Sequence, residues 1–295
     1  MSLAMTTGQR KRRVRFRPRK IVANAGAAVL GMAIAIWTVV PVYNMVLIAL
    51  SDDGDEFSGT VWPDDPSLES FRVIWNESYW YLENFWHQFG NSLYIGLATM
   101  AATVVIGSFA SFAMGRMRLR KAWLIGNFSL ITYAVPSSFL VIPFTHLMHI
   151  YGLTDNLWSV IASQVAFATP YAILILHQYG KLIPLELDEA ARVDGAGPFQ
   201  VYWRIYLPLM APALAAVATY ALLVAWNEYL YQFLLLSSPR SMTVAVAIDQ
   251  FFDSDEAPWN YMMAVALVYS IPPIAVYYAL RRYMVAGLTM GGVKG

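Results

Sequence analysis

Six long apolar stretches constrain the fold of this chain more than any other feature. A helix crosses a bilayer with about 20 residues at a rise of about 1.5 Å each. Stretches of this length lie near residues 22–50, 91–115, 122–149, 157–180, 207–236 and 259–280. Of the 295 residues, 58% are hydrophobic and only 13% are charged, unlike the usual balance of a soluble domain. The sequence therefore predicts an all-α integral membrane protein with six transmembrane helices.

Proline residues fall within several of these stretches. Each proline removes a backbone donor from a helix, so we expect a kink or a break at each position. These positions are Pro41, Pro136, Pro143, Pro170, Pro212, Pro272 and Pro273. The first stretch is longer than the apolar core of about 7 to 15 residues in a secretory signal peptide. We therefore expect it to remain as a membrane span.

Charged residues are segregated by sign between the connecting segments. Basic residues precede the first stretch and follow the second and the sixth: Arg10, Lys11, Arg12, Arg13, Arg15, Arg17, Arg19, Lys20, Arg116, Arg118, Arg120, Lys121, Arg281 and Arg282. The loop 51–90 carries nine acidic residues and a single Arg72, and the loop 237–258 also contains an acidic cluster. Basic segments stay on the cytoplasmic side, so we expect both termini to be cytoplasmic and the two acidic loops to lie outside.

The basic N-terminal segment has an alternative interpretation, because runs of Lys and Arg also attract nucleic-acid phosphates. Its position directly before a span favours a role in orientation and contact with anionic membrane lipid. No basic patch with interleaved aromatic residues recurs elsewhere, so no nucleic-acid partner is expected. The chain has no cysteine, which excludes disulfides and cysteine-containing metal sites.

A spaced motif occupies residues 189–208, in a polar segment between the fourth and fifth stretches. It reads EAARVDGAGPFQVYWRIYLP. This pattern resembles the signature loop of permeases of ATP-binding cassette (ABC) importers, whose fixed positions are here Glu189, Ala190, Ala191, Gly195, Ile205, Leu207 and Pro208. The resemblance implies a type I ABC importer permease fold, in which the loop 185–208, with Asp194, contacts a separate ATPase.

The same segment has the local signals of a short, stiff helix. Pro184 suits a first helical turn, Gly195 suits a left-handed ending, and three acidic residues favour the positive helix end: Glu186, Asp188 and Glu189. Gly197-Pro198 predicts a turn before a second helical stretch around 199–206. The two alanines of the motif would keep one surface thin enough to dock in a groove. An ordinary amphipathic connecting loop is the alternative interpretation.

Further resemblance points to one branch of these permeases. The segments KLIPLELDEAARVDGA at 181–196, AWNEYLYQFLLLSS at 225–238 and GLTMGGVKG at 287–295 are similar to the carbohydrate-uptake (maltose-type, MalG-like) family. The short first external loop agrees with this subunit. The resemblance divides the chain into a basic cytoplasmic segment 1–20, a permease domain 21–285 and a cytoplasmic tail 286–295.

The resemblance also implies partners. They are a second homologous permease in a heterodimer, two ATPase subunits and an extracytoplasmic solute-binding protein, in the bacterial inner membrane. The chain is then not an enzyme and holds no cofactor of its own, because Mg-ATP would bind the ATPases. The tail has a glycine spacing similar to that of a phosphate-binding loop, but it lacks the Ser or Thr after Lys294 and the strand and helix that such a loop requires. The tail is instead expected to contact the ATPase, through Gly291, Gly292 and Lys294.

Polar residues inside the fifth stretch are candidates for the translocation path. They are Asn227, Glu228 and Gln232, with Trp226 and Tyr231 beside them. Glu228 and Gln232 are four residues apart and should share one helix face, which would avoid lipid. Such side chains can bind sugar hydroxyls or stack on a sugar ring. A polar seam against the partner permease is the alternative interpretation. The histidines suggest packing or an interface, and no metal site is expected.

The second external loop is expected to meet the binding protein, through Asp249, Gln250, Phe251 and Phe252. A solvated connector held by its aromatic residues is the alternative. A carbohydrate or sugar derivative is the expected cargo, moved by alternating access. A polyol, a glycerol phosphodiester or an anionic sugar derivative is the alternative cargo, and the residues do not exclude it. An ion-coupled carrier is a poorer alternative, because intramembrane charge is almost limited to Glu228.

Overall fold

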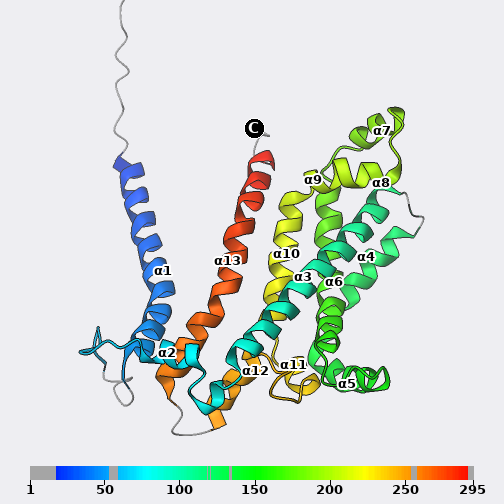
Figure 1. The fold of residues 1–295 in the computed structure, drawn as a ribbon. Helices are drawn as coiled ribbons and strands as arrows, with labels where there is room; N and C mark the ends of the chain where they lie inside the picture. Colours follow the sequence, from blue (N-terminus) through cyan, green and yellow to red (C-terminus); the bar gives the residue numbers. More distant parts are fainter. Residues whose placement is uncertain are drawn as a thin grey trace, which may run out of the picture.

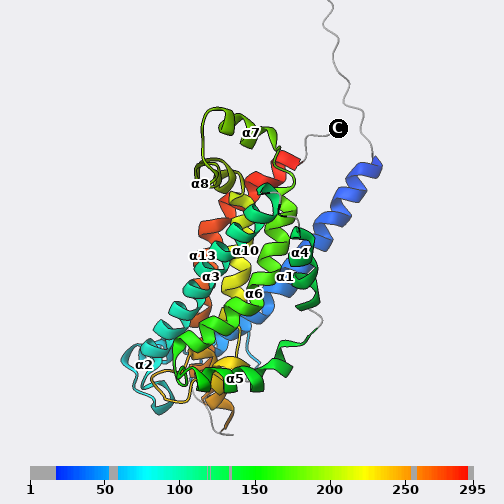
Figure 2. The same cartoon turned by 90° about the vertical axis from the view of Figure 1, so that its right-hand side faces the viewer.

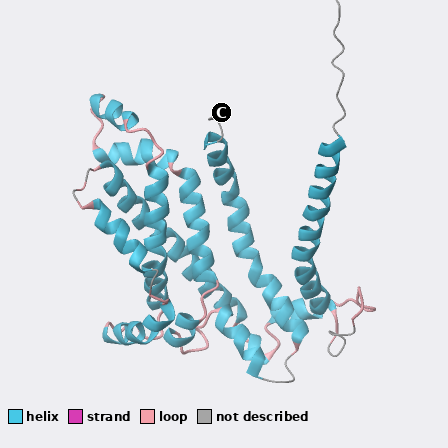
Figure 3. Ribbon diagram, turned by 180° about the vertical axis from the view of Figure 1, so that it is seen from behind, coloured by secondary structure: helices cyan, strands magenta, loops and turns pink. Residues whose placement is uncertain are grey.

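Helices are the only regular elements in the described part of the computed structural model, which comprises residues 18–52, 59–117, 119, 121–132, 135–253 and 258–291. Figure 3 shows them joined by short loops. In chain order they are α1 (Pro18–Leu50), α2 (Glu69–Asn76), η1 (Trp80–Leu82), α3 (Phe85–Arg116), α4 (Ala122–Ile131), η3 (Ser137–Leu140), α5 (Val141–Ile150), α6 (Leu157–Gly180), α7 (Glu186–Val193), α8 (Pro198–Val201), η4 (Tyr202–Tyr206), α9 (Leu207–Leu209), α10 (Ala211–Trp226), α11 (Leu230–Leu235), α12 (Val244–Asp249), η5 (Gln250–Asp253) and α13 (Trp259–Gly291). The all-α prediction is confirmed for these residues.

Four helical segments are long and apolar enough to cross a membrane: Asn24–Leu50, Trp80–Arg116, Leu157–Gly180 and Trp259–Met284. A fifth candidate is a bent pair, Pro198–Leu209 and Ala211–Trp226, whose two helices meet at 78°. The first, second, fourth and sixth predicted stretches therefore correspond to long helices. The count of six spans stays a prediction.

The predicted third span, 122–149, is not one helix. α4 ends at Ile131 and is ten residues long, and a second apolar helical segment covers Ser137–Ile150. Pro136 immediately precedes η3 in an extended conformation that a helix cannot continue through. In Figures 1 and 2, α5 lies across the end of the bundle rather than along it. The predicted stretch is therefore divided at Pro136, one of the positions where a kink or a break is expected.

The predicted fifth span, 207–236, is also broken. Pro212 lies in the first turn of α10, where a missing N–H costs nothing. α10 ends at Trp226 and α11 begins only at Leu230, so residues 227–229 interrupt the helix. Elsewhere the helices continue through their prolines, at Pro41 in α1, Pro170 in α6 and Pro272-Pro273 in α13.

The two ends of the bundle carry different elements. The beginning of α1, the end of α13 and the short helices α7 and α8 lie at one end, and α2, α5, α11 and α12 lie at the other (Figures 1 and 2). The motif loop thus shares an end with the described limits of the chain. This arrangement agrees with the charge pattern, which assigns both to one side of the membrane.

α3, α6 and α10 form the centre of the bundle, with α13 packed on α10 and α1 packed on α13. α3 approaches α6 closely because Gly107 has no side chain: a Cβ there would lie 3.0 Å from the Cβ of Ala172. α1 differs from these helices, since its side chains from Asn24 to Asn44 are exposed along almost the whole length. The central three helices therefore supply the rigid frame on which the motif loop stands.

Candidate functional site

α7 is the short helix that the motif predicts. It begins at Glu186, two residues after Pro184, and its first turn carries the three acidic residues. It ends at Val193, and Gly195 follows with a φ of +85°, a left-handed conformation that glycine adopts without strain. The N–H of Ala196 donates to the carbonyl of Ala191 at 2.9 Å and closes the end of the helix.

The second helical stretch is also confirmed. Gly197 and Pro198 begin α8, and the side chain of Gln200 accepts a hydrogen bond from the N–H of Gly197 at 2.9 Å. η4 then forms one turn of π-helix, in which the N–H of Leu207 donates to the carbonyl of Tyr202. Pro208 follows and lacks an N–H, so the widened turn lies where ordinary helical bonding would fail.

The motif residues divide between an outer and an inner surface. Glu189, Ala190, Asp194 and Gly195 are exposed, as is Pro208. Ala191 and Leu207 instead pack against the buried cluster between α3, α6 and α10, and Ile205 is half-buried. Ala190 therefore lies on the exposed side of the loop, whereas Ala191 does not, so only Ala190 remains a candidate for a thin docking surface. Ala191 is small where α7 meets its own bundle.

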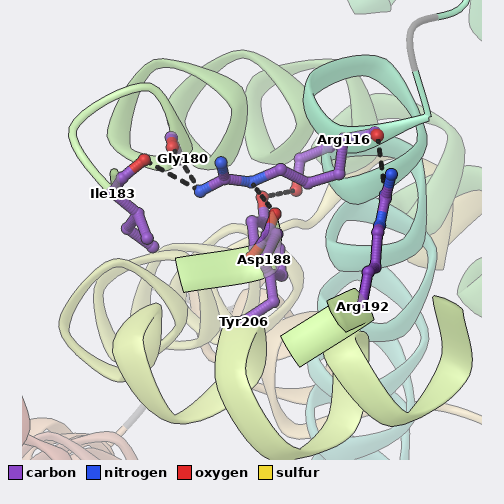
Figure 4. A network of polar contacts seen from close by, with 7 residues as sticks. Arg116, Gly180, Ile183, Asp188, Arg192 and Tyr206 are labelled. Atoms are coloured by element: carbon purple, nitrogen blue, oxygen red, sulfur yellow. Dashed lines mark hydrogen bonds and ion pairs between the residues drawn. The ribbon is translucent and has the colours of Figure 1, made fainter. Parts of the chain in front are cut away.

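A buried ion pair fastens α7 to the bundle (Figure 4). Nε of Arg116, the last residue of α3, lies 3.2 Å from Oδ2 of Asp188, and the two side chains are only 2% and 5% exposed. The same guanidinium donates to the carbonyls of Ile183 at 3.0 Å and Gly180 at 3.4 Å. It also lies over the ring of Tyr206, 5.7 Å from its centre. Arg116 thus joins the ends of α3 and α6 to α7 and η4.

The electrostatics of this pair depend on burial. Loss of water raises the pKa of the Asp188 carboxyl above its ordinary value, although the guanidinium groups of Arg116 and Arg192 oppose that rise. Arg192 also donates to the backbone carbonyl of Arg116 at 3.4 Å. On the other side, the hydroxyl groups of Tyr206 and Ser111 lie 3.0 Å apart. The loop is therefore held by charge and hydrogen bonds as well as by apolar packing.

Sequence reasoning assigned Arg116 only to the orientation signal and Asp188 only to the favourable start of a helix. Their pairing needs the end of α3, the α6–α7 turn and α7 to meet in space, which no local pattern reveals. One signal was available: Arg116 directly follows a long apolar stretch, so it could lie inside the bundle instead of in the turn.

The outer side of the loop presents large apolar side chains. Val193 is 87% exposed, and the exposed fractions of Leu182, Leu185, Phe199 and Trp203 lie between 51% and 76%. Large apolar side chains that are exposed within one short segment indicate an interaction surface. A small cavity of about 160 Å³ lies beneath, lined by Arg116, His177, Lys181 and Tyr206 among others. The loop therefore has the form of a docking surface with a buried anchor.

The candidate residues of the translocation path lie at the break between α10 and α11. Glu228 precedes α11, and its carboxylate accepts hydrogen bonds from the backbone N–H groups of Tyr231 at 2.9 Å and Gln232 at 3.2 Å. Glu228 and Gln232 therefore do not share a helix face, and that expectation is wrong. The carboxylate instead satisfies the first N–H groups of α11, as capping side chains do.

Their neighbours also bond within the chain. Trp226 is buried, stacks on Tyr269 at 4.6 Å and accepts from its hydroxyl at 2.6 Å. Asn227 donates to the carbonyl four residues before it at 2.8 Å. The amide of Gln232 donates to the backbone of α10 at 3.0 Å, and the hydroxyl of Tyr231 donates to the backbone before α5. These side chains hold the break in place.

The candidate contacts with a binding protein lie at the opposite end from α7. Asp249 is exposed and accepts a hydrogen bond from the hydroxyl of Tyr229 at 2.6 Å, and Phe252 is also exposed. Gln250 is half-buried. Phe251 is buried against Tyr79 and Tyr81, so its side chain supports the loop from within and cannot reach a partner in this conformation.

In the tail, Gly291 is the last residue of α13, whereas Gly292 and Lys294 lie outside the described residues. No group of three or more His, Asp or Glu side chains in the described ranges is arranged to hold a metal ion.

Long apolar helices, joined at one end by an exposed helical loop with an apolar outer surface, define a multi-pass membrane subunit. The chain belongs to the family described as binding-protein-dependent transport system inner membrane component, whose sequence profile matches residues 80–289. The predicted importer permease class and inner-membrane location are confirmed. α1 lies outside the matched residues.

Relatives and a solved structure agree with this assignment. The chain is 33% identical over 271 residues to the trehalose transport system permease protein SugB of Mycobacterium tuberculosis, covering 91% of this chain and 97% of the relative. It is 33% identical over 243 residues to the maltodextrin transport system permease protein MdxG of Bacillus subtilis, covering 81% and 83%. The fold is similar, with a TM-score of 0.76 and 21% identity, to a chain of a bacterial ABC transporter involved in import of the acidic polysaccharide alginate, covering 91% and 98%.

Proposed function

We propose that this chain is the permease subunit of an ATP-driven importer for a carbohydrate, and that α7 receives the movement of a separate ATPase. The observation that carries the proposal is the motif loop: an exposed apolar and acidic surface on a short helix that a buried ion pair fixes to α3. A stiff helix with a rigid anchor transmits a displacement instead of absorbing it.

The route of coupling follows from the contacts. A displacement of α7 passes through Asp188 to Arg116 and the end of α3, and through η4 and α9 to α10. α3 and α10 are central helices of the bundle, so tilting them changes which end of the path is open. Alternating access then follows from ATP-dependent closure of the ATPases.

The cargo is proposed from the relatives. Permeases named for trehalose and maltodextrin transport share about a third of their residues with this chain over most of its length. The carbohydrate class follows from those names together with the maltose-type motifs. A polyol, a glycerol phosphodiester or an anionic sugar derivative is the alternative cargo for the same architecture.

The remaining parts of the complex follow from the family. We infer a heterodimer with a homologous permease, two ATPase subunits that bind Mg-ATP, and an extracytoplasmic solute-binding protein. The segments 1–20 and 286–295 would then flank the permease domain 21–285 on the cytoplasmic side, and Gly291, Gly292 and Lys294 would contact the ATPases. Asp249, Gln250 and Phe252 remain candidates for the binding-protein contact, and the 226–232 segment remains a candidate for the path.

The first experiment measures the ATPase activity of the complex in lipid nanodiscs with its binding protein. The panel contains neutral sugars, sugar phosphates, sugar sulfonates and polyols. Stimulation by a neutral sugar only when the binding protein is present supports the proposal. Stimulation only by a polyol or an anionic compound favours the alternative cargo, and a complex without an ATPase subunit contradicts the importer.

Two variants test the coupling role of α7. Gly195→Val places a β-branched residue at φ +85°, and Glu189→Lys reverses an exposed charge on the docking surface. Both should retain membrane insertion and lose sugar uptake that depends on ATP hydrolysis. Gly197→Val is the matched control, because Gly197 has a φ of −74° that valine adopts readily. Unchanged uptake in both variants would contradict the coupling role.

A further inference from the structure

A pocket of about 430 Å³ lies at the end of the bundle opposite α7. One wall consists of η1 and the beginning of α3, with Trp80, Tyr81, Glu83, Asn84 and Gln88. The other wall is the segment 239–250, which contributes Gln250. The volume lies in the range of small-molecule sites, which are about 300 to 1,000 Å³. Its position is the external mouth of the bundle in the proposed topology.

Aromatic rings form one side of this pocket. The ring of Trp80 stacks on that of Tyr81, with centres 3.6 Å apart and planes at 29°. Tyr81 in turn packs against the buried Phe251, 5.3 Å between ring centres, so the pair stands on the core of the external end. Trp80 is nevertheless 62% exposed. Tyr81 covers one face of the indole, and the exposure leaves indole surface available to a ligand.

Amide groups with unused bonding capacity form the other side. Gln88 is only 4% exposed, and its Nε2 donates to the carbonyl of Pro239 at 3.3 Å, but its Oε1 has no partner. A buried acceptor without a donor is costly and invites a hydroxyl group. Among the described residues, the hydrogen-bond partner of the Gln250 amide nitrogen is the sulfur of Met242 at 3.9 Å, a weak acceptor. Asn84 precedes α3 without capping it.

We propose that this pocket binds one neutral sugar ring at the external mouth, as the cargo leaves the binding protein. A sugar offers an apolar C–H face for the indole of Trp80 and hydroxyl groups that donate to Gln88 and accept from Gln250 and Asn84. Among the described residues that line the pocket, Glu83 alone carries an acidic or basic side chain. The pocket therefore disfavours phosphorylated and carboxylated sugars.

This inference rests on the proposed carbohydrate importer but goes beyond it, because it assigns a sugar contact to the external mouth of this subunit. A side chain of the binding protein is the competing occupant. The lining favours the sugar, since a buried amide acceptor beside an open aromatic ring matches alternating hydroxyl and C–H groups on one small ligand.

The experiment uses the assembled, nucleotide-free complex in nanodiscs without binding protein. Equilibrium dialysis measures the binding of radiolabelled trehalose, maltotriose and any neutral sugar that stimulates the ATPase, with glucose 6-phosphate as the anionic comparison. Trp80→Ala and Gln88→Leu are the test variants. Trp62→Ala is the matched control, because Trp62 is an exposed tryptophan of the same external loop that does not line the pocket.

Saturable binding of a neutral sugar, weakened about tenfold or more by Trp80→Ala and Gln88→Leu but not by Trp62→Ala, is the expected result. Trp80 is exposed, so its variant tests the pocket even where Gln88→Leu assembles poorly. The inference is overturned if the complex is stimulated by sugar with its binding protein but Trp80→Ala binds sugar as the wild type does.

The same set of measurements separates the other outcomes. Weaker docking of ligand-free binding protein to Trp80→Ala, with sugar binding unchanged, identifies the pocket as a protein contact and overturns the sugar assignment. Failure of every sugar to stimulate the wild-type complex overturns the proposed function itself, before any pocket variant is compared.

Discussion

Arg116→Met is the substitution with the largest expected effect on α7. The methionine fills much of the space of the arginine side chain but removes the charge beside Asp188, whose carboxylate oxygens have no hydrogen-bond partner. Both side chains of the pair are at least 95% buried. Removing one partner from such a pair costs about 3–5 kcal/mol, because the other charge stays buried and unpaired.

This cost should fall on the fastening of α7 more than on the whole fold. Arg116 contacts the chain at the loop end of the bundle, whereas the other two buried clusters contain neither Arg116 nor any residue of α7. A loss of about 3–5 kcal/mol in local stability corresponds to about 140- to 3,700-fold faster amide exchange, at a factor of ten for each 1.4 kcal/mol.

Hydrogen exchange with mass spectrometry on the complex in nanodiscs measures this change directly. The peptide that contains 186–193 should exchange faster in Arg116→Met, and peptides from the centre of α3 should not change. ATP hydrolysis that no longer produces uptake should accompany the faster exchange.

The double variant Arg116→Met/Asp188→Leu is the control for the physical cause. Replacing both partners of a buried pair by apolar residues is often close to neutral, so exchange in α7 should return most of the way to that of the wild type. Wild-type exchange in Arg116→Met, or equal losses in the single and double variants, would refute the argument from the unpaired charge.

Two further predictions concern the ends and the centre of the bundle. The carboxylate of Asp155 accepts hydrogen bonds from the N–H groups of Ser237 and Ser238 and from the hydroxyl of Ser241. Burial alone would raise the pKa of Asp155, but these hydrogen bonds outweigh burial and lower the pKa from 3.8 to about 2. The ionised Asp155 therefore contributes fully to stability above about pH 4, and this contribution is lost as the pH falls towards 2. Melting curves recorded from pH 5 to pH 2 should show this pH dependence in the wild type, and Asp155→Asn should abolish it. Gly107→Leu should separate α3 from α6 and cost about 1–3 kcal/mol in a thermal or denaturant melt. Gly115→Ala should be tolerated, because its Cβ would lie 3.9 Å from Nδ1 of His177. Melting of Gly107→Leu at the wild-type temperature would contradict the close approach of these helices.

Much of the motif loop could be predicted because its signals are local. The acidic first turn, the glycine at the end of α7 and the Gly197-Pro198 turn each act within a few residues, and the structure contains all three. Long apolar helices could be predicted for the same reason, since hydropathy and helix length are both local properties.

The breaks could be predicted less well. Apolar composition from 122 to 149 is compatible with one span or with two helices that lie at different angles, and Pro136 alone marked the boundary. The interruption at 227–229 had no proline to announce it. The contacts of Glu228 explain the interruption. Its carboxylate accepts hydrogen bonds from the first N–H groups of α11, so a new helix begins just after Glu228.

The buried pair and the external pocket could not be predicted, because each joins segments far apart in the sequence. Arg116 is basic and follows a span, which is the pattern of an orientation signal. Its burial is tolerable because Asp188 and the carbonyls of Gly180 and Ile183 surround the guanidinium. Gln88 lies in an apolar helix, and only segment 239–250 turns it into the wall of a pocket.

The packing of α1 on α13 has a consequence for the order of synthesis. α1 leaves the ribosome before α13, and roughly 200 residues separate them, which takes about 10 to 40 seconds at 5–20 residues per second. During that interval the first helix has almost none of its final neighbours within the chain. The exposed side chains of α1 must then contact lipid or another protein while translation continues. The first neighbours of α1 are therefore outside this chain, and they are in place before α13 can pack against it.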